Sequence, residues 1–162
     1  MHSPSTIQGS DATRLAQRIK VWGRELGFQR VGISDTDLGV AEARLLAWLD
    51  RGWQGDMNYM ARHGARRARP RELVPGTVRV ISVRMNYRPA GARHSWEVIE
   101  DGSRGFVSRY ALGRDYHRLL RRRLQRFAER IEREVGAFRY RAFTDSGPVL
   151  EVELATRAGL GW

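Results

Sequence analysis

Residues 144–148, with the sequence TDSGP, combine a carboxylate, two hydroxyl groups and a tight turn. The segment follows a predicted strand at residues 138–143, and the C-terminal ends of strands are where α/β proteins commonly place their functional side chains. Asp145 would act there as a general acid if burial raised its pKa. Spacing alone favours a simpler interpretation, in which Asp145 and Ser146 cap a helix that we expect at residues 150–158.

A second segment, residues 108–117 (SRYALGRDYH), gathers many polar functional groups. Tyr110 and Arg114 could hold the amides or phosphates of a ligand, and His117 could bind a metal or a cofactor. A single histidine near the start of a helix more often caps the helix or lies on the surface, so that alternative stays open. The four histidines do not have the spacing of a metal site, and no glycine-rich phosphate-binding motif is present.

The positive charge of the chain lies in two blocks. The 162 residues carry a net charge of +11, and 28 of the 29 basic residues are arginine. Residues 62–93 hold nine arginines against one acid, and residues 104–141 hold twelve against four, which leaves +8 in each block. Arginine makes bidentate contacts to phosphate and stacks on bases, so the blocks fit an RNA partner. A merely solvated arginine-rich surface is the alternative.

Apolar residues recur with the periods of helices and strands in alternation. The clearest helix covers residues 116–135, where an apolar stripe is opposed by arginines. Other helices are predicted at residues 11–26, 45–52 and 150–158, and strands at residues 28–34, 77–84 and 138–143. Residues 106–112 fit an edge strand or an ordered loop. This alternation predicts an α/β (α+β) sandwich, a central sheet flanked by helices, with the strand order open.

Composition excludes several classes of site and of protein. The chain has no cysteine, so it forms no disulfide, zinc–thiolate site or cysteine-ligated cluster. No apolar run reaches the roughly 20 residues of a membrane span. The polar N-terminus lacks the apolar stretch of a signal peptide. We therefore expect a cytoplasmic monomer without a membrane partner, with residues 1–10 as a disordered tail.

Six stretches of the chain, taken in order, resemble the N-terminal, cobalamin-binding part of the epoxyqueuosine reductase family. They are WGRELGFQRVGISDTDL (22–38), GDMNYMARH (55–63), RARPRELVPGTVRVISVRMNY (67–87), SRYALGRDYHRLLRRRL (108–124), DSGPVLE (145–151) and AGLGW (158–162). The resemblance implies reduction of epoxyqueuosine to queuosine in the anticodon loop of tRNA. It also implies cobalamin as cofactor, with electrons from iron–sulfur clusters in a ferredoxin-like domain.

The resemblance implies roles for individual residues. Asp145 matches the family's catalytic acid, which donates a proton to the substrate oxygen as the C–O bond breaks, and this reverses its interpretation as a cap. A donor must be protonated, so we expect a water-poor, apolar site around it. The implied cobalamin contacts are Arg67, Ser108, Arg109, Tyr110 and Asp145. No metal ligand is implied in this chain.

The chain departs from the family's pattern after the GLGW stretch. The family continues into a cysteine-rich ferredoxin-like domain and a helical repeat domain, and neither is present here. Residues 11–162 are therefore expected to form a truncated catalytic domain, with a sandwich that is incomplete at the C-terminus and inactive alone. Either the chain is a fragment or a second polypeptide supplies the rest. The alternative function is a non-catalytic cobalamin- or tRNA-binding module. Leu160 and Trp162 are expected to leave an exposed apolar patch.

Overall fold

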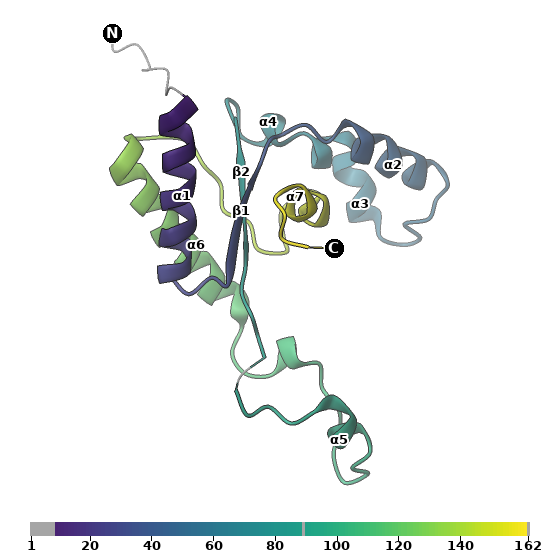
Figure 1. Ribbon diagram of the computed structural model, residues 1–162. Coiled ribbons are helices and arrows are strands. Elements are labelled where there is room, and N and C mark those ends of the chain that lie inside the picture. The colour runs from purple at the N-terminus through teal and green to yellow at the C-terminus, as the bar shows by residue number, and fades with distance from the viewer. Residues whose placement is uncertain (1–8, 89, 162) are drawn as a thin grey trace.

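The computed structural model describes residues 9–88 and 90–161. Helices and two short strands alternate along the chain (Figure 1). The elements are α1 (Gly9–Glu25), β1 (Arg30–Ser34), α2 (Gly39–Asp50), α3 (Asn58–His63), η1 (Gly64–Ala68), α4 (Pro70–Leu73), β2 (Val80–Arg84), α5 (Ser95–Ile99), η2 (Arg109–Ala111), α6 (Tyr116–Val135) and α7 (Glu151–Arg157). Among the described residues, no helix is long and apolar enough to cross a membrane.

The two strands form one antiparallel sheet between two layers of helices. Arg30 pairs with Arg84, and Val31 pairs with Val83. Since successive side chains point to opposite faces, the odd-numbered strand residues pack with the core of α1 and α6, while Val80 packs with the cluster that includes α7. Figure 1 shows α1 and α6 on one side of the sheet and α7 on the other.

The main core lies on the α1–α6 side of the sheet. Its buried members are Ile19, Trp22, Phe28, Val31, Phe127 and Ile131. Burying a side chain of this size contributes about 1.5–3 kcal/mol. Gly23 of α1 makes the close packing possible, because a Cβ at this position would lie 2.3 Å from Cγ2 of Val31.

The end of α7 lies directly against β1. A Cβ on Gly32 would lie 2.3 Å from the carbonyl oxygen of Ala158, so only glycine fits without a shift. Leu160 is buried, and its carbonyl oxygen accepts a hydrogen bond of 3.0 Å from Nη1 of Arg84. The predicted exposure of Leu160 is therefore wrong, because the chain buries this side chain where residues 158–161 return against β1 and β2; Trp162 lies outside the described residues.

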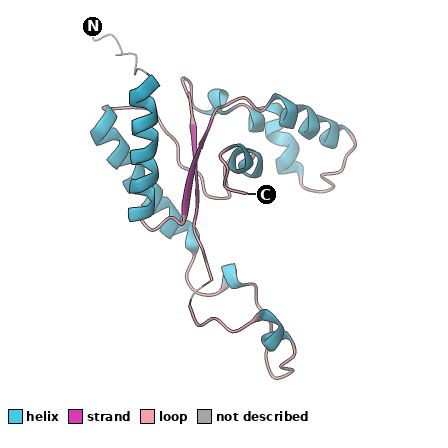
Figure 2. Cartoon of the chain, in the orientation of Figure 1, coloured by secondary structure: helices cyan, strands magenta, loops and turns pink. Residues whose placement is uncertain are grey.

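A separate lobe is formed by α2, α3, η1 and α4, and a longer excursion carries α5 away from the sheet (Figure 2). The guanidinium of Arg69 binds both carboxylate oxygens of Glu42, at 2.6 and 2.9 Å, and so ties the loop before α4 to α2. The connection between α2 and α4 is a loop followed by the short helices α3 and η1.

The sandwich fold class is confirmed, with one difference in its elements. Residues 138–143, predicted as a strand, make no ladder with β2. Of the two alternatives left open for residues 106–112, the structure has the ordered loop, which contains η2. The 138–143 segment is tied to α6 instead, because the Tyr140 hydroxyl accepts a hydrogen bond of 2.7 Å from Gln125. Helix α1 begins at Gly9, inside the predicted tail, and residues 1–8 lie outside the described residues.

Candidate active site

Asp145 lies in a tight turn between residues 138–143 and α7. Its φ is +57°, and it is the only residue other than glycine with a positive φ among those described. Aspartate tolerates this left-handed conformation better than most residues, and such conformations concentrate at functional sites. The amide of Ser146 donates a hydrogen bond of 2.6 Å to the Thr144 carbonyl, and Gly147 packs against the Phe143 ring with no room for a Cβ. The turn therefore fixes where the Asp145 carboxylate points.

The first turn of α6 brings two more functional side chains to this carboxylate. The Tyr116 hydroxyl donates a hydrogen bond to Oδ2 of Asp145, and Nε2 of His117 lies 3.4 Å from the same oxygen. The rings of Tyr116 and His117 stack, with centroids 4.2 Å apart. Two side chains from one turn of α6, a phenol and an imidazole, therefore contact the Asp145 carboxylate.

Asp115 completes the cluster from the opposite side of the imidazole. As the N-cap of α6, its Oδ1 accepts a hydrogen bond of 2.9 Å from the His117 amide and lies 2.7 Å from Nδ1 of His117. This contact favours the Nδ1–H tautomer, because a carboxylate accepts and does not donate. Nε2 is then the ring nitrogen that faces Asp145. The contact with Asp115 therefore orients the imidazole toward Asp145.

Three groups around the turn have shifted pKa values. The hydrogen bond to Asp145 raises the pKa of Tyr116 to about 12, so the phenol stays protonated at neutral pH. The hydrogen bond from the His117 ring lowers the pKa of Asp115. Burial raises the pKa of Glu151, and the charge of Asp145 raises it further. At neutral pH, Asp115 is therefore an ionised carboxylate that orients His117, and Tyr116 is a protonated phenol that donates to Asp145.

An elongated groove of about 900 Å³ opens beside the cluster. It runs between β2, α6, residues 138–143 and α7, and its lining is mostly apolar. Tyr110, Tyr116 and Asp145 belong to the lining, and the rings of Tyr110 and Tyr116 meet edge to face with centroids 6.3 Å apart. The groove is large enough for a sizeable ligand and presents Asp145 to it.

The surroundings of Asp145 differ from the predicted water-poor site. Its side chain is 53% exposed in this chain. The physical reason is that the turn and the first residues of α6 contact it from one side, while the groove leaves the other side open to solvent.

Only two of the five implied cofactor contacts line the groove. Tyr110 and Asp145 line the groove, whereas Ser108 and Arg109 flank Tyr110 without lining it. Arg109 donates a hydrogen bond to the carbonyl of Arg93, which lies just before α5. Arg67 is buried, at 7% exposure, and is not part of the lining.

The guanidinium of Arg67 is already occupied by the backbone. It donates hydrogen bonds to the carbonyls of Tyr59, at 2.7 Å, and Met60, at 3.2 Å. Its own carbonyl accepts a hydrogen bond of 3.1 Å from the amide of Leu150, which lies at the start of α7. Arg67 therefore joins the lobe to the start of α7, and it does not line the groove.

Sequence reasoning missed the roles of Asp115 and Tyr116. In the sequence, the ring of Tyr116 fits the apolar stripe of the helix at residues 116–135, which hides its hydroxyl as a functional group. The signal that could have revealed them is the triplet DYH at the helix start, which puts three functional groups into one turn. The metal interpretation of His117 gains no support, since the described residues contain no group of three side chains that could hold a metal ion.

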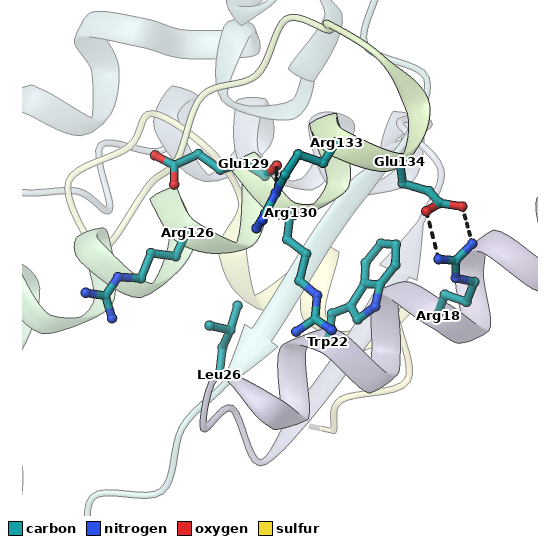
Figure 3. Close-up of a pocket in the computed structure, with 8 residues that line it drawn as sticks. All are labelled: Arg18, Trp22, Leu26, Arg126, Glu129, Arg130, Arg133 and Glu134. Carbon is teal, nitrogen blue, oxygen red and sulfur yellow. Dashed lines mark hydrogen bonds and ion pairs between the residues drawn. The ribbon is translucent and has the colours of Figure 1, made fainter.

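A second pocket, of about 570 Å³, lies in the seam between α1 and α6 (Figure 3). Its charges are largely paired: Arg18 binds both oxygens of Glu134, and Arg130 lies 2.6 Å from Glu25. The guanidinium groups of Arg18 and Arg130 lie 4.9 and 5.3 Å from the ring of Trp22. Arg126, Glu129 and Arg133 also line this pocket and form no ion pair among the described residues, but most of its wall is the packed contact between the two helices.

Comparisons with known proteins agree on one family. Residues 67–146 match a family model described as epoxyqueuosine reductase QueG, DUF1730. The chain is 61% identical to the epoxyqueuosine reductase of Pseudomonas aeruginosa over 152 residues. The aligned region covers 94% of this chain and 42% of that relative. The chain is a homologue of the epoxyqueuosine reductases. It is also 57% identical over 152 residues to the Escherichia coli enzyme, so it spans about two fifths of the length of these relatives.

Solved epoxyqueuosine reductases have the same fold. The Streptococcus thermophilus structure matches with a TM-score of 0.70 at 22% identity, over 90% of this chain and 39% of that one. A Bacillus subtilis structure, described with an aspartate-bearing catalytic loop swung out of the active site, matches with a TM-score of 0.70 at 21% identity, over 93% of this chain and 39% of that one. The expected relation to this family is confirmed.

Proposed function

We propose that this chain supplies the proton-donating side of an epoxyqueuosine reductase active site. The observation that carries the proposal is the contact of Asp145 with both Tyr116 and His117 at the end of the groove. Support comes from relatives of up to 61% identity that bear this name, and from a Bacillus subtilis structure whose catalytic loop contains an aspartate. Asp145 is proposed as the catalytic residue.

The chemistry of epoxide reduction explains what such a cluster does. Removing the epoxide oxygen to leave an alkene consumes two electrons and two protons and releases water. The oxygen becomes strongly basic as its C–O bond breaks, so a positioned acid lowers the barrier. In the proposed role, the Asp145 carboxyl gives its proton to this oxygen, and solvent, which reaches the exposed side of Asp145, replaces that proton and supplies the second one. Asp115 keeps the imidazole oriented, and Tyr116 keeps the carboxyl in place.

The groove fits cobalamin by its chemistry. A largely apolar lining suits the flat face of a macrocycle, and hydroxyl and guanidinium donors suit its many amides. We propose that Tyr110 contacts the cofactor from the groove wall and that Ser108 and Arg109 do so from the rim. Cobalamin would supply a redox-active cobalt at this position. Iron–sulfur clusters would have to be held by other polypeptide, because this chain has no cysteine.

Helix α6 offers a surface for the tRNA partner. Arg118, Arg122 and Arg126 recur at every fourth position, are exposed, and form no ion pair within the described part of the chain. Such a row suits successive phosphates of an RNA backbone. One related structure was solved with an epoxyqueuosine-modified tRNA stem loop, and it matches this chain with a TM-score of 0.70.

The competing function is a module that binds cobalamin or tRNA without turnover. Adding the chain to cob(II)alamin and recording the visible spectrum tests cofactor binding, and retention of a tRNA hairpin at two salt concentrations tests phosphate contacts. Turnover is tested in a longer protein, which we call the chimera. It is the Pseudomonas aeruginosa relative in which the aligned region, 42% of its length, is replaced by this chain. Conversion of epoxyqueuosine tRNA by the chimera, lost in Asp145→Asn, is the result we expect; a module predicts binding and no Asp145-dependent conversion.

A further inference from the structure

The strained backbone of Asp145 has to be held in place by its neighbours. With a φ of +57°, this residue has a conformation that persists only where the surrounding structure imposes it. The Ser146 amide donates a hydrogen bond of 2.6 Å to the Thr144 carbonyl. The Val149 amide donates one of 2.9 Å to the Gly147 carbonyl. Neither bond involves the amide of Asp145 itself, so its orientation depends on other contacts.

From one side, α6 contacts the side chains of this turn. The Tyr116 hydroxyl donates a hydrogen bond to the Asp145 carboxylate, and the His117 ring approaches the same group. One turn later in α6, Nη2 of Arg121 donates a hydrogen bond of 3.3 Å to the hydroxyl of Ser146. These contacts bind side chains of the turn, and a contact to the main chain of Asp145 has to come from elsewhere.

From the other side, the first residue of α7 reaches the main chain of the turn. The carboxylate of Glu151 accepts a hydrogen bond from the backbone amide of Asp145. Among the described residues, no backbone carbonyl accepts a hydrogen bond from this amide. Both residues line the same groove, and α6 and α7 lie on opposite sides of the sheet (Figure 1). The turn is therefore held between the two helices, by its side chains from α6 and by its main chain from α7.

The position of Glu151 is itself fixed by buried contacts. The amide of the preceding residue, Leu150, donates a hydrogen bond of 3.1 Å to the carbonyl of Arg67. The Leu150 carbonyl accepts one of 3.0 Å from the amide of Leu154, which is 3% exposed and packs in a cluster with Ala68. A group that orients another residue needs such a fixed base. The backbone from which the Glu151 side chain projects provides it.

We propose that Glu151 is a positioning residue of the proton-donating site, which holds the amide of Asp145 and so keeps the carboxyl of Asp145 in contact with Tyr116 and His117. The inference rests on the proposed function of Asp145. In this role Glu151 contacts neither the substrate nor the reacting oxygen. A glutamate suits the position, because a carboxylate is a strong acceptor for a backbone amide. An acidic residue in the first turn of a helix is also favourable.

The competing role for Glu151 is that of a second acid. Burial raises its pKa, and the charge of Asp145 raises it further. An acid has to be protonated, whereas the acceptor of an amide hydrogen bond is stronger when it is ionised. The hydrogen bond from the Asp145 amide favours the ionised form of Glu151. The two roles therefore need different protonation states, and variants of Glu151 separate them.

Titration of Tyr116 in this chain tests the proposal without any turnover. Its pKa, raised to about 12 by the contact with Asp145, reports whether that carboxylate is in place. We expect Glu151→Ala to lower this pKa by about 1 or more, toward the usual value of about 10. Glu151→Gln keeps an acceptor oxygen and should lower it by less than about half as much. Glu153→Ala is the control, because it removes an acid from the same turn of α7 and should change nothing.

Single-turnover conversion of epoxyqueuosine tRNA by the chimera tests the consequence for the reaction. We expect Glu151→Ala to lower conversion about tenfold or more, because the acid is no longer held in its productive position. The spectral change of cob(II)alamin should stay the same, and Glu151→Gln should recover most of the conversion. Amide hydrogen exchange in α1 checks that each variant is folded. If Glu151→Ala does not fold, Glu151→Asp replaces it with the same expectations, since it keeps the charge and shortens the reach.

Three results would overturn the proposal. The first is a Tyr116 resonance that still titrates near 12 in folded Glu151→Ala. The second is conversion by that variant at the rate of the unmodified chimera. The third is an equal loss of conversion in Glu151→Ala and Glu151→Gln, which would make Glu151 an acid and not an acceptor. The proposed function fails by a different result, undiminished conversion by Asp145→Asn.

Discussion

The phenol of Tyr116 donates a hydrogen bond to the carboxylate of Asp145, and this contact joins the first turn of α6 to the turn before α7. The two residues are 29 positions apart in the chain. His117 approaches the same oxygen from the next position of α6. The behaviour of Asp145 therefore depends on α6 as much as on its own turn.

Replacing Asp145 with asparagine should lower the pKa of Tyr116. The hydrogen bond to the carboxylate, together with its charge, raises that pKa to about 12. A neutral amide is a weaker acceptor and carries no charge, so the pKa should fall toward the usual value of about 10. Titration of ¹³C-labelled tyrosine by NMR measures this, with Tyr116→Phe assigning the resonance. Tyr59 and Tyr87 serve as internal controls. A Tyr116 resonance that still titrates near 12 in Asp145→Asn would contradict the contact.

The free energy of unfolding should decrease in acid. Hydrogen bonds lower the folded-state pKa of four carboxylates: Asp35, Glu42, Asp101 and Asp115. A group with a depressed folded pKa contributes stability above its unfolded pKa, about 4, and loses it as the pH falls through the folded value. Glu151 acts in the opposite direction because its pKa is raised. Urea unfolding at pH 6, 4 and 3 measures the net effect.

Asp115→Asn is the matched variant for this acid dependence. Asparagine still caps a helix, so the variant should keep the fold at pH 6 while its stability falls less steeply between pH 4 and 3. Equal slopes for the variant and the unmodified chain would show that Asp115 does not contribute.

Gly32→Ala should destabilise the chain by about 1–3 kcal/mol, the usual cost of overpacking a tight contact. The new Cβ would lie 2.3 Å from a backbone oxygen of Ala158, so the end of α7 has to move away from β1. Gly102→Ala is the control, since nothing lies within 4 Å of a Cβ there. Urea denaturation compares the two variants. Equal midpoints would mean that α7 does not lie against β1.

Removing the arginine row of α6 should weaken binding to a tRNA hairpin and flatten its salt dependence. Each lost phosphate contact reduces the slope of log K against log salt by about 0.7–0.9. The triple variant replaces Arg118, Arg122 and Arg126 with alanine. The control replaces Arg24, Arg44 and Arg62, which are equally exposed on α1, α2 and α3. Equal losses in both variants would show that only net charge matters.

Local signals in the sequence predicted the helices well. Helix α6 begins and ends as predicted, because Asp115 caps its N-terminus, Gly136 follows its last residue, and one apolar stripe runs between them. The strands at β1 and β2 were also predicted, although each is shorter than its apolar segment. The strand at residues 138–143 failed because a ladder needs a neighbour, and no sequence pattern reveals whether that neighbour is present.

The site could be predicted only in part. The role of Asp145 came from the family resemblance, and the resemblance also placed Tyr110, which lines the groove. The contact of Asp145 with Tyr116 and His117 depends on how α6 packs across the sheet, which local patterns do not contain. The hydrogen bonds of Arg67 to two backbone carbonyls were not predictable either, because they depend on how α3 and η1 fold back on each other.

Conversion of epoxyqueuosine tRNA by the chimera under single-turnover conditions tests whether Asp145 is the proton donor. Mass spectrometry of the tRNA nucleosides measures conversion, and the visible spectrum of cob(II)alamin measures cofactor binding in the same samples. We expect Asp145→Asn to keep the spectral change and to lower conversion by a factor of about 100 or more, while Asp56→Asn, an exposed control, changes neither. Conversion by Asp145→Asn at the rate of the unmodified chimera would contradict the role of Asp145 as proton donor.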